Sequence, residues 1–423
     1  MLNSNLLRRK FLKKPKTVAV LFLISFSLII SIFYYTYVKN HPVNPSEFPV
    51  INIKSDNKID SKQKYSDCTF ELDTKGESED VGPINAKIKL RGVFNTRMPK
   101  KDYRIKLSVQ TELLEMHEEN DWQLFAMFMD ITHLRIKLSF DLYRKFLATD
   151  PTAILPDSRY VCLYINGEFQ GLYLLAQRNN RRFFGLDDSQ NNVNSSLIFQ
   201  AGTRSTDFKD YDDSTWEQDW PNEYEGYYIM NEIMINLVSF VRDSPNEIFF
   251  DNKSGIYTLF DKLNLIDFFL YNFFILHKDF WANNYYLVRN TCPNKFFLIP
   301  WDFDQSFGQF LTREYDSDEN SEQEIFSRNY LFYRLILNEN FRQDCKKRWF
   351  ELRETILTEE IILDLVSEYY SDIEDVLYLD CELWYPKLYG EEWEKETVDI
   401  KIKELYEWIP KRLSFCDLYF SNY

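Results

Sequence analysis

The chain has 423 residues, 17% of them aromatic, and carries 50 basic and 66 acidic side chains, a formal net charge of −16. Its aromatic content and its low glycine count (11) exclude a disordered or collagen-like chain, and its length suffices for two or three folding units or one large two-lobed unit. The acidic balance argues against nucleic acid as a partner, because binding to phosphates needs a basic surface.

The first 40 residues differ from the rest, because they hold seven Lys and Arg and no acid. Residues 18–38 read VAVLFLISFSLIISIFYYTYV, an uncharged stretch long enough to cross a bilayer once. Because basic residues precede it, we expect 1–17 to be a cytoplasmic tail and 18–38 a single-pass signal-anchor helix. Everything after residue 40 would then be extracytoplasmic, at a cell surface or in a secretory lumen. A cleaved signal peptide is the alternative, although its apolar region is usually shorter.

Residues 39–83 are polar and contain three prolines in their first part. This composition predicts a stem between the anchor and a folded domain. Regular patterning begins near residue 84, where apolar and basic residues alternate in AKIKLR at 86–91 and again in YRIKLSV at 103–109. Such alternation predicts two half-buried strands, joined here by a long loop with a basic tip.

A helix and a second hairpin follow. Apolar residues recur every three or four positions between 132 and 147, which predicts an amphipathic helix. Two apolar runs, 159–165 and 169–176, flank the dipeptide Asn166-Gly167, and Asn-Gly between such runs indicates a tight hairpin.

The second half of the chain is richer in helix. Residues 189–222 are polar and acidic, which predicts irregular structure, whereas 263–276 are strongly apolar and predict a buried helix. Short apolar runs at 285–289 and 295–300 predict two strands, and the pattern is helical from residue 340 onward. Together these elements predict an α+β fold.

The six cysteines form no CxxC pair, which argues against a zinc ribbon or a thioredoxin-type site. Disulfides and scattered buried thiols both remain open. The cysteines are Cys68, Cys162, Cys292, Cys345, Cys381 and Cys416.

A first cluster of polar residues, HKDFWANN at 277–284, follows the predicted buried helix. Asp279 with an Asn five residues later, Asn284, has the layout of a protein-kinase catalytic loop, which supplies a base and a metal ligand. The alternative is structural: Asp279 as a cap of the preceding helix and Asn284 as a turn residue, with Asn283 an equal candidate.

A second cluster, PWDFDQSFG at 300–308, places Asp302 and Asp304 after a short strand, where carboxylates hold Mg²⁺ together with phosphate oxygens. Two acids in an otherwise apolar run are costly unless they are paired or metal-bound. Lys106, in the second predicted strand, resembles the strand lysine that holds nucleotide phosphates in kinases. The order of these features favours phosphoryl transfer, which depends on positioning and charge neutralisation.

These segments resemble the CotH kinase family, the atypical protein kinases similar to spore coat protein H, over residues 84–420. The matching stretches are KIKLRG (87–92), PKKDYRIKL (99–107), DWQLFA (121–126), LRIKLSFDL (134–142), YINGEFQGLYLL (164–175), NNYYL (283–287), IPWDFDQSFG (299–308), RWFELR (348–353) and LYEWIPKRLSF (405–415).

The resemblance implies an atypical protein-kinase-like, two-lobed fold that binds ATP and Mg²⁺, or Mn²⁺ in its place, and phosphorylates Ser or Thr of protein substrates. By position, it implies that Asp279 is the catalytic base and that Lys106 holds the nucleotide phosphates. Asn284 and Asp302 would bind the metal, and Asp304 would be a second metal ligand or a structural acid.

Two further positions carry nucleotide-binding expectations. Arg91 begins a loop, 91–96, that in the family typically reads RGNSS and is implied to cover the phosphates; here Val93 and Phe94 replace the small residues. Gln177 stands where the family commonly has an acid that orients adenine or a cation.

The expected kinase domain spans 84–423 and divides into a smaller N-lobe (84–178), an insert (179–234) and a helical C-lobe (235–423). The alternative function is a catalytically weak pseudokinase or a surface adhesin or scaffold with the same fold. An enzyme acting on surface glycans would need a pair of acids flanking a groove, and the sequence singles out none.

Overall fold

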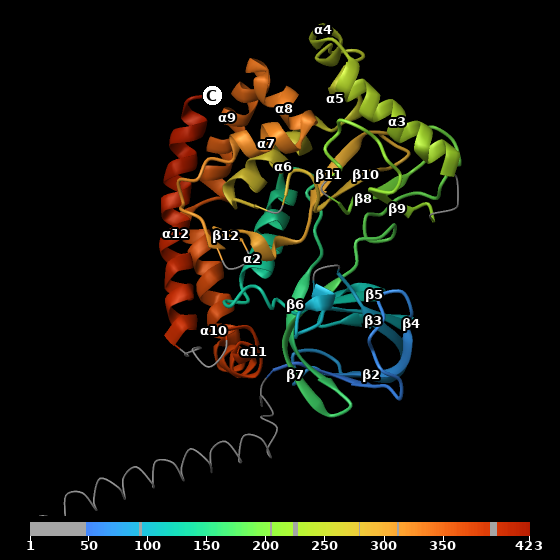
Figure 1. Cartoon of the computed structure of the whole chain (residues 1–423), viewed down its shortest axis with the longest axis vertical. Helices are drawn as coiled ribbons and strands as arrows, with labels where there is room; N and C mark the ends of the chain where they lie inside the picture. The colour runs from blue at the N-terminus through green and yellow to red at the C-terminus, as the bar shows by residue number, and fades with distance from the viewer. Residues whose placement is uncertain are drawn as a thin grey trace, which may run out of the picture. The chain divides into compact units, whose positions relative to one another are not determined.

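Seven strands at the start of the described chain close into a β-barrel, the lower right part of Figure 1. The computed structural model describes residues 48–92, 95–203, 205–222, 227–278, 280–310, 313–389 and 396–423. Alternate side chains such as Ile88, Ile105 and Trp122 fill the barrel interior and are fully buried. The strands are β1 (Val50–Lys54), β2 (Ser66–Asp73), β3 (Val81–Leu90), β4 (Tyr103–Leu113), β5 (Met116–Phe125), β6 (Ser158–Ile165) and β7 (Glu168–Gln177).

The ring order is β1-β2-β3-β4-β5-β7-β6, and β1 closes it by pairing antiparallel with β2 and parallel with β6. The prediction of a polar stem over 39–83 is therefore wrong for the part that contains β1 and β2. Polar residues such as Asn52 face outward on β1, while Ile51 and Ile53 are buried inside the barrel. The predicted hairpin around Asn166 is confirmed as the β6–β7 pair.

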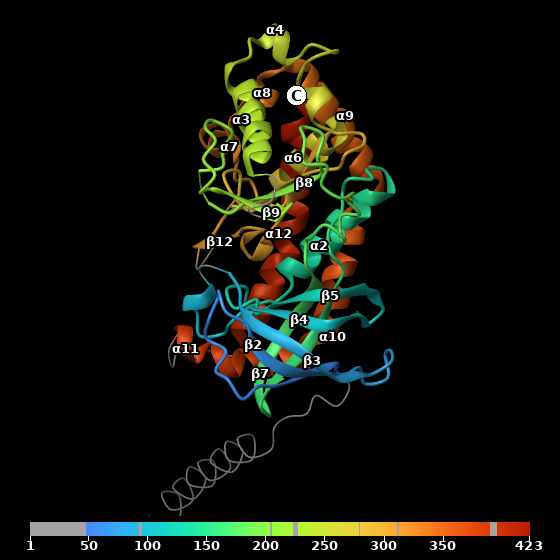
Figure 2. The ribbon, with the colours of Figure 1, turned by 90° about the vertical axis from the view of Figure 1, so that its right-hand side faces the viewer.

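A second, four-stranded antiparallel sheet has the order β11-β10-β8-β9. Figures 1 and 2 both show it above strands β4 and β5 of the barrel. Its strands are β8 (Leu197–Ala201), β9 (Trp216–Trp220), β10 (Tyr285–Arg289) and β11 (Phe296–Pro300). Strands β10 and β11 confirm the predicted pair, but the prediction that 189–222 is irregular is wrong, because β8 pairs with both β10 and β9.

Helices make up most of the remaining described chain. The predicted buried helix is confirmed as α6, whose N-cap residue Asp261 accepts a hydrogen bond from the backbone N–H of Asn264. Helices α10 and α12 are the long pair that pack side by side in Figure 1. The α-helices are α2 (Arg135–Arg144), α3 (Tyr227–Asp243), α4 (Asn246–Phe249), α5 (Ile256–Leu259), α6 (Lys262–Phe274), α7 (Glu322–Arg328), α8 (Tyr330–Leu337), α9 (Glu339–Thr355), α10 (Glu359–Trp384), α11 (Pro386–Tyr389) and α12 (Glu396–Ser421).

Short elements complete the order. They are the 3₁₀ turns η1 (Asn95–Arg97), η2 (Lys145–Ala148) and η3 (Phe303–Gln305) and the strands β12 (Gln309–Phe310) and β13 (Arg313–Glu314). The α+β class predicted from the sequence is confirmed. All six cysteines are free thiols, and only Cys292 is exposed.

A buried ionic cluster joins the barrel to α10, and we call Lys100, His133 and Asp380 the barrel–helix cluster. Lys100 Nζ lies 2.6 Å from Asp380 Oδ1, and His133 Nε2 lies 2.9 Å from Asp380 Oδ2. The backbone N–H of Leu172 donates a 2.7 Å hydrogen bond to Asp380 Oδ1. Gly171 has a φ of +105°, and a Cβ there would overlap the Asp380 carboxylate, so only glycine fits this position without displacement.

Within the described part of the chain, no helix has both the length and the apolar character needed to span a bilayer. The predicted tail (1–17) and anchor (18–38) lie outside the described residues, as does the start of the predicted stem.

Candidate active site

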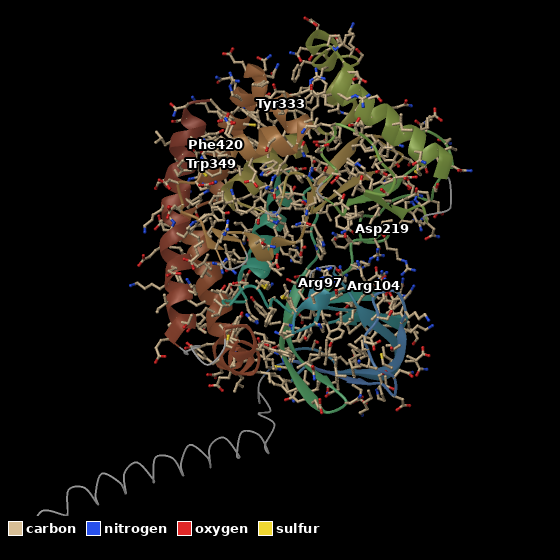
Figure 3. All side chains as sticks on the ribbon, in the orientation of Figure 1. Arg97, Arg104, Asp219, Tyr333, Trp349 and Phe420 are labelled. Atoms are coloured by element: carbon tan, nitrogen blue, oxygen red, sulfur yellow. The ribbon has the colours of Figure 1, made fainter. Side chains whose placement is uncertain are left out.

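A cleft with a volume of about 1000 Å³ lies between the outer face of the barrel and the β8–β11 sheet. Figure 3 labels one lining residue from each side, Arg104 on β4 and Asp219 on β9. Pockets for small molecules are typically about 300–1000 Å³. The cleft is therefore large enough for a ligand the size of a nucleotide.

The barrel side of the cleft carries its basic residues. Lys89 and Arg104 extend from the outer faces of β3 and β4, while Arg91 follows β3 and Arg178 follows β7. Lys62, between β1 and β2, also lines the cleft. We call these five side chains the basic wall.

The opposite side carries the acidic residues that line the cleft. Asp213, Glu217 and Asp219 belong to β9 and the segment before it, and Asp302 follows β11. We call these four side chains the acidic wall. Opposite charges on facing walls suit a ligand that is itself anionic and carries a cation, such as a metal-bound polyphosphate.

One ion pair crosses from wall to wall. Arg178 Nη2 donates to Asp219 Oδ1 at 2.5 Å, and Arg178 Nη1 lies 3.7 Å from Asp121 Oδ2. Burial alone would lower the pKa of Arg178, but the charges of Asp219 and Asp121 outweigh burial and raise that pKa. Arg178 therefore stays charged and ties β9 to the barrel at one edge of the cleft.

Asn284 and Asp302, the two predicted metal ligands, both line the cleft. The backbone N–H of Trp301, the residue before Asp302, donates a 2.9 Å hydrogen bond to the carbonyl of Asn284. The backbone carbonyl oxygen of Asp302 lies 2.8 Å from His277 Nε2, and this contact holds the turn that carries Asp302. The structure thus brings these two residues together although 18 positions separate them in the sequence.

Both residues also adopt left-handed backbone conformations, with φ of +61° at Asn284 and +64° at Asp302. Asn and Asp tolerate this region better than other non-glycine residues. Such conformations cluster at functional sites, where the surrounding structure holds them in place. Two such conformations occur here on adjoining turns that both line the cleft.

Asn283 supplies a third side-chain oxygen of the kind that binds metal ions. It lines the cleft, is 8% exposed, and its Oδ1 is buried with no hydrogen-bond partner among the described residues. A buried amide oxygen without a partner is unfavourable unless a ligand completes it. Carboxylate and amide oxygens suit Mg²⁺, so Asp302, Asn284 and Asn283 fit this ion. Within the described ranges, no group of three or more His, Cys, Asp or Glu side chains is placed to hold a metal ion.

The other residues predicted for the catalytic loop and the metal do not line the cleft or lie outside the described residues. Asp279, the expected base, lies outside the described residues, as do Val93 and Phe94 of the expected phosphate loop. Asp304 is half-buried in η3 and does not line the cleft. Its side chain is thus not brought to the cleft with Asp302, because the 3₁₀ turn redirects the chain between them.

The expectation that Lys106 reaches the same cleft is not met. Lys106 is exposed on β4 and is not part of the cleft lining, whereas Arg104, two residues earlier on the same face of the strand, is. Two residues along a strand move a side chain by about 6.6 Å. That displacement carries Lys106 past the end of the cleft.

Of the two residues predicted to contact the nucleotide, Arg91 lines the cleft and Gln177 does not. Arg91 lines the cleft, pairs with Asp102 at 3.3 Å and lies over the Phe125 ring at 4.3 Å. Gln177 is buried outside the cleft lining, and its Nε2 donates a 2.6 Å hydrogen bond to the carbonyl of His117. The next residue, Arg178, takes the place in the cleft that was expected for Gln177.

Residues 179–234 contribute more to the site than their sequence suggested. This segment, expected to be an insert, supplies β8, β9 and three of the four acids of the acidic wall. It also supplies aromatic lining residues, Tyr211 and Trp216. The alternating pattern WEQDW, at Trp216–Trp220, is the local signal that indicates a strand here.

The chain is similar to proteins of a known family. No curated protein matches the chain. The family model described as CotH kinase protein matches residues 88–416, which include β4, the Asn284 and Asp302 turns and most of α12. The match covers well over half of the chain and makes it a kinase-like protein, in a family whose members use ATP and a metal ion in general. This chain belongs to the CotH kinase family.

Proposed function

We propose that this protein transfers the γ-phosphoryl group of ATP to Ser or Thr hydroxyls of protein substrates, with its own chain among the candidate targets. The observation that carries the proposal is the meeting of Asn284 and Asp302 in the cleft, facing the basic wall. Phosphoryl transfer requires oxygen ligands for a metal and cations for phosphate oxygens, and little covalent chemistry from the protein.

In the proposed reaction the acceptor hydroxyl gives its proton to the Asp279 carboxylate while its oxygen bonds to the γ-phosphorus. The bond between that phosphorus and the oxygen bridging to the β-phosphate breaks, and ADP leaves with the electron pair. Asp302, Asn284 and Asn283 would hold Mg²⁺, which when bound offsets negative charge on the phosphate oxygens. The basic wall orients the phosphates and lowers the repulsion that they present to the incoming hydroxyl.

We further propose that residues 18–38 anchor the protein and place the kinase domain outside the cytoplasm. The support is the uncharged 21-residue stretch and the basic residues before it. Alkaline carbonate extraction of membranes from cells producing the full-length chain tests this. Retention of the intact chain in the pellet, lost after deletion of 18–38, is the expected result; release of the intact chain into the supernatant contradicts it.

The function is tested with the full-length chain in detergent, Mg²⁺, ATP labelled on the γ-phosphate and a Ser/Thr-rich protein acceptor. Asp302→Asn and Asp279→Asn are each expected to lower the rate of transfer by about 100-fold or more, because metal binding and proton removal are lost. The exposed Asp56→Asn serves as the matched control and should transfer at the wild-type rate. Acid hydrolysis of the product identifies phosphoserine or phosphothreonine.

The scaffold or pseudokinase alternative has a distinct outcome in the same experiment. A wild-type chain that binds ATP without incorporating label into the acceptor or itself would contradict the transferase. So would label that persists undiminished in both variants.

A further inference from the structure

The most unusual feature of the basic wall is a pair of like charges placed directly opposite each other. Lys89 on β3 and Arg104 on β4 are paired in the strand register. Like charges at such positions destabilise a sheet. Lys87 and Lys106 form a second pair of this kind on the same strands, but both are exposed, so water screens them. Lys89 is partly buried and Arg104 lies inside the cleft, where screening is weaker.

Arg104 is held so that one end of its guanidinium is left for a ligand. Its Nε and Nη2 donate to the two carboxylate oxygens of Asp121 at 2.7 and 2.5 Å. Asp121 is itself largely buried, with an 8% exposed side chain. The remaining nitrogen of Arg104, Nη1, makes no hydrogen bond to any residue that the structure describes. Asp121 therefore fixes the guanidinium plane and leaves two N–H donors open to the cleft.

Lys89 has no carboxylate within ion-pair distance among the described residues, and its ammonium lies 4.7 Å from the centre of the Tyr65 ring. Burial, and then the charges of Arg104 and Arg178, lower the pKa of Lys89. The barrel thus places two adjacent cations, Lys89 and Arg104, in the cleft. The carboxylate of Asp121 contacts Arg104 and also Arg178, and it does not contact Lys89. An anion bound between Lys89 and Arg104 would give the Lys89 ammonium an ion-pair partner and would accept hydrogen bonds from the open N–H donors of Arg104.

We infer that Lys89 and Arg104 bind the phosphate chain of the nucleotide, with Asp121 as the residue that positions Arg104. This assignment rests on the proposed use of ATP and replaces Lys106, which lies outside the cleft lining. Its ligand class is a polyphosphate, because two cations side by side match several phosphate oxygens better than one carboxylate.

The test is calorimetric titration of the full-length chain in detergent with inorganic tripolyphosphate, MgATP and AMP. Lys89→Met should weaken tripolyphosphate and MgATP binding about 10-fold and AMP binding much less, because AMP lacks the outer phosphates. Lys89→Arg should restore most of the loss. Lys87→Met, two residues along the same face of β3, is the matched control and should bind as the wild type does.

Arg104→Gln tests the second cation, with circular dichroism to verify folding. Because this change leaves Asp121 without its partner, the double variant Arg104→Gln/Asp121→Asn accompanies it. Both should weaken tripolyphosphate binding about 10-fold or more.

Wild-type affinity for tripolyphosphate in both Lys89→Met and the double variant would overturn the assignment. A loss of tripolyphosphate affinity that occurs in Lys106→Met alone would overturn it as well. Absence of tripolyphosphate binding by the wild type would overturn it too. A further outcome separates this assignment from the proposed function. If the wild type binds tripolyphosphate but transfers no phosphate, and Lys89→Met loses the binding, the assignment is supported and the proposed transferase function is contradicted.

Discussion

Two of the contacts between the barrel and the rest of the domain contain Lys or Arg beside Asp. In the barrel–helix cluster, Lys100 and Asp380 are 0% and 1% exposed, and the carboxylate of Asp380 contacts Lys100, His133 and the Leu172 N–H. In the cleft, Lys89 has no carboxylate partner and Asn283 Oδ1 no hydrogen bond within the described ranges. The first contact is closed to water and the second opens onto a cleft of about 1000 Å³.

This contrast separates charges that hold the fold together from charges that are available to a ligand. Buried charges survive only when their hydrogen bonds are complete, so removal of one partner should cost stability. Charges lining an open cleft keep contact with water, so their removal should affect ligands far more than folding. Substitutions at the barrel–helix cluster and in the cleft should therefore differ in how strongly they change the free energy of unfolding.

Asp380→Ala should lower the free energy of unfolding by about 3–5 kcal/mol, because Lys100 is left as an unpaired buried charge. Asp375→Ala, on an exposed position of the same helix α10, is the matched control and should change it by less than about 0.5 kcal/mol. Urea unfolding followed by circular dichroism measures both. Equal values for the two variants would show that the barrel–helix cluster is not a structural contact.

Gly171→Ala should destabilise the protein by about 2–3 kcal/mol, since the new Cβ meets the Asp380 carboxylate and the backbone φ is +105°. Gly76→Ala separates the two causes. Gly76 has a φ of +88°, but no atom lies within 4 Å of the position that a Cβ would take, so only the backbone cost, about 1 kcal/mol, applies. Thermal unfolding of both variants measures the difference, and identical midpoints would rule out a steric role for Asp380.

Acid should weaken the same contact. Burial opposes charge on Asp380, but Lys100 and His133 outweigh it and hold the pKa of Asp380 below its usual 3.8. A lowered carboxylate pKa contributes stability above the unfolded-state value, and that contribution is lost as the pH falls through the folded-state value. The stability gap between wild type and Asp380→Asn should therefore be smaller below about pH 4 than at pH 5. Urea titrations across this range test it, and a gap that widens in acid would contradict the assignment.

Asp302→Asn should leave the unliganded free energy of unfolding within about 0.5 kcal/mol of wild type. Asn tolerates the left-handed backbone of this position, and the side chain lines the open cleft. Mg²⁺-dependent binding of ATP, measured by calorimetry, should nevertheless fall at least about 10-fold. A loss of stability comparable to that of Asp380→Ala would place Asp302 among the structural charges.

Local patterns predicted much of the fold correctly. The alternation at 86–91 and 103–109 lies largely within β3 and β4, the Asn166-Gly167 turn joins β6 to β7, and the apolar run 263–276 contains most of α6. These predictions succeed because period-2 alternation, turn chemistry and apolar runs act over a few neighbouring residues.

The errors share a physical cause. Strand β1 is five residues long, lies among polar residues and is completed by β6, more than 100 positions later. Strand β8 is likewise completed by β10, about 85 positions later. Such strands become stable only through partners that no local pattern reveals.

Local patterns, with motifs such as IPWDFDQSFG and NGEFQGLYLL, were enough to predict the α+β class, the family and the residue types that the proposed phosphoryl transfer needs. Which charges share the cleft became known from the folded structure alone. On β4, Arg104 and Lys106 are equivalent in pattern, yet one lines the cleft and the other is exposed. Position along a strand relative to a second sheet depends on how the barrel and the β8–β11 sheet pack, and that packing arises from contacts between residues far apart in the chain.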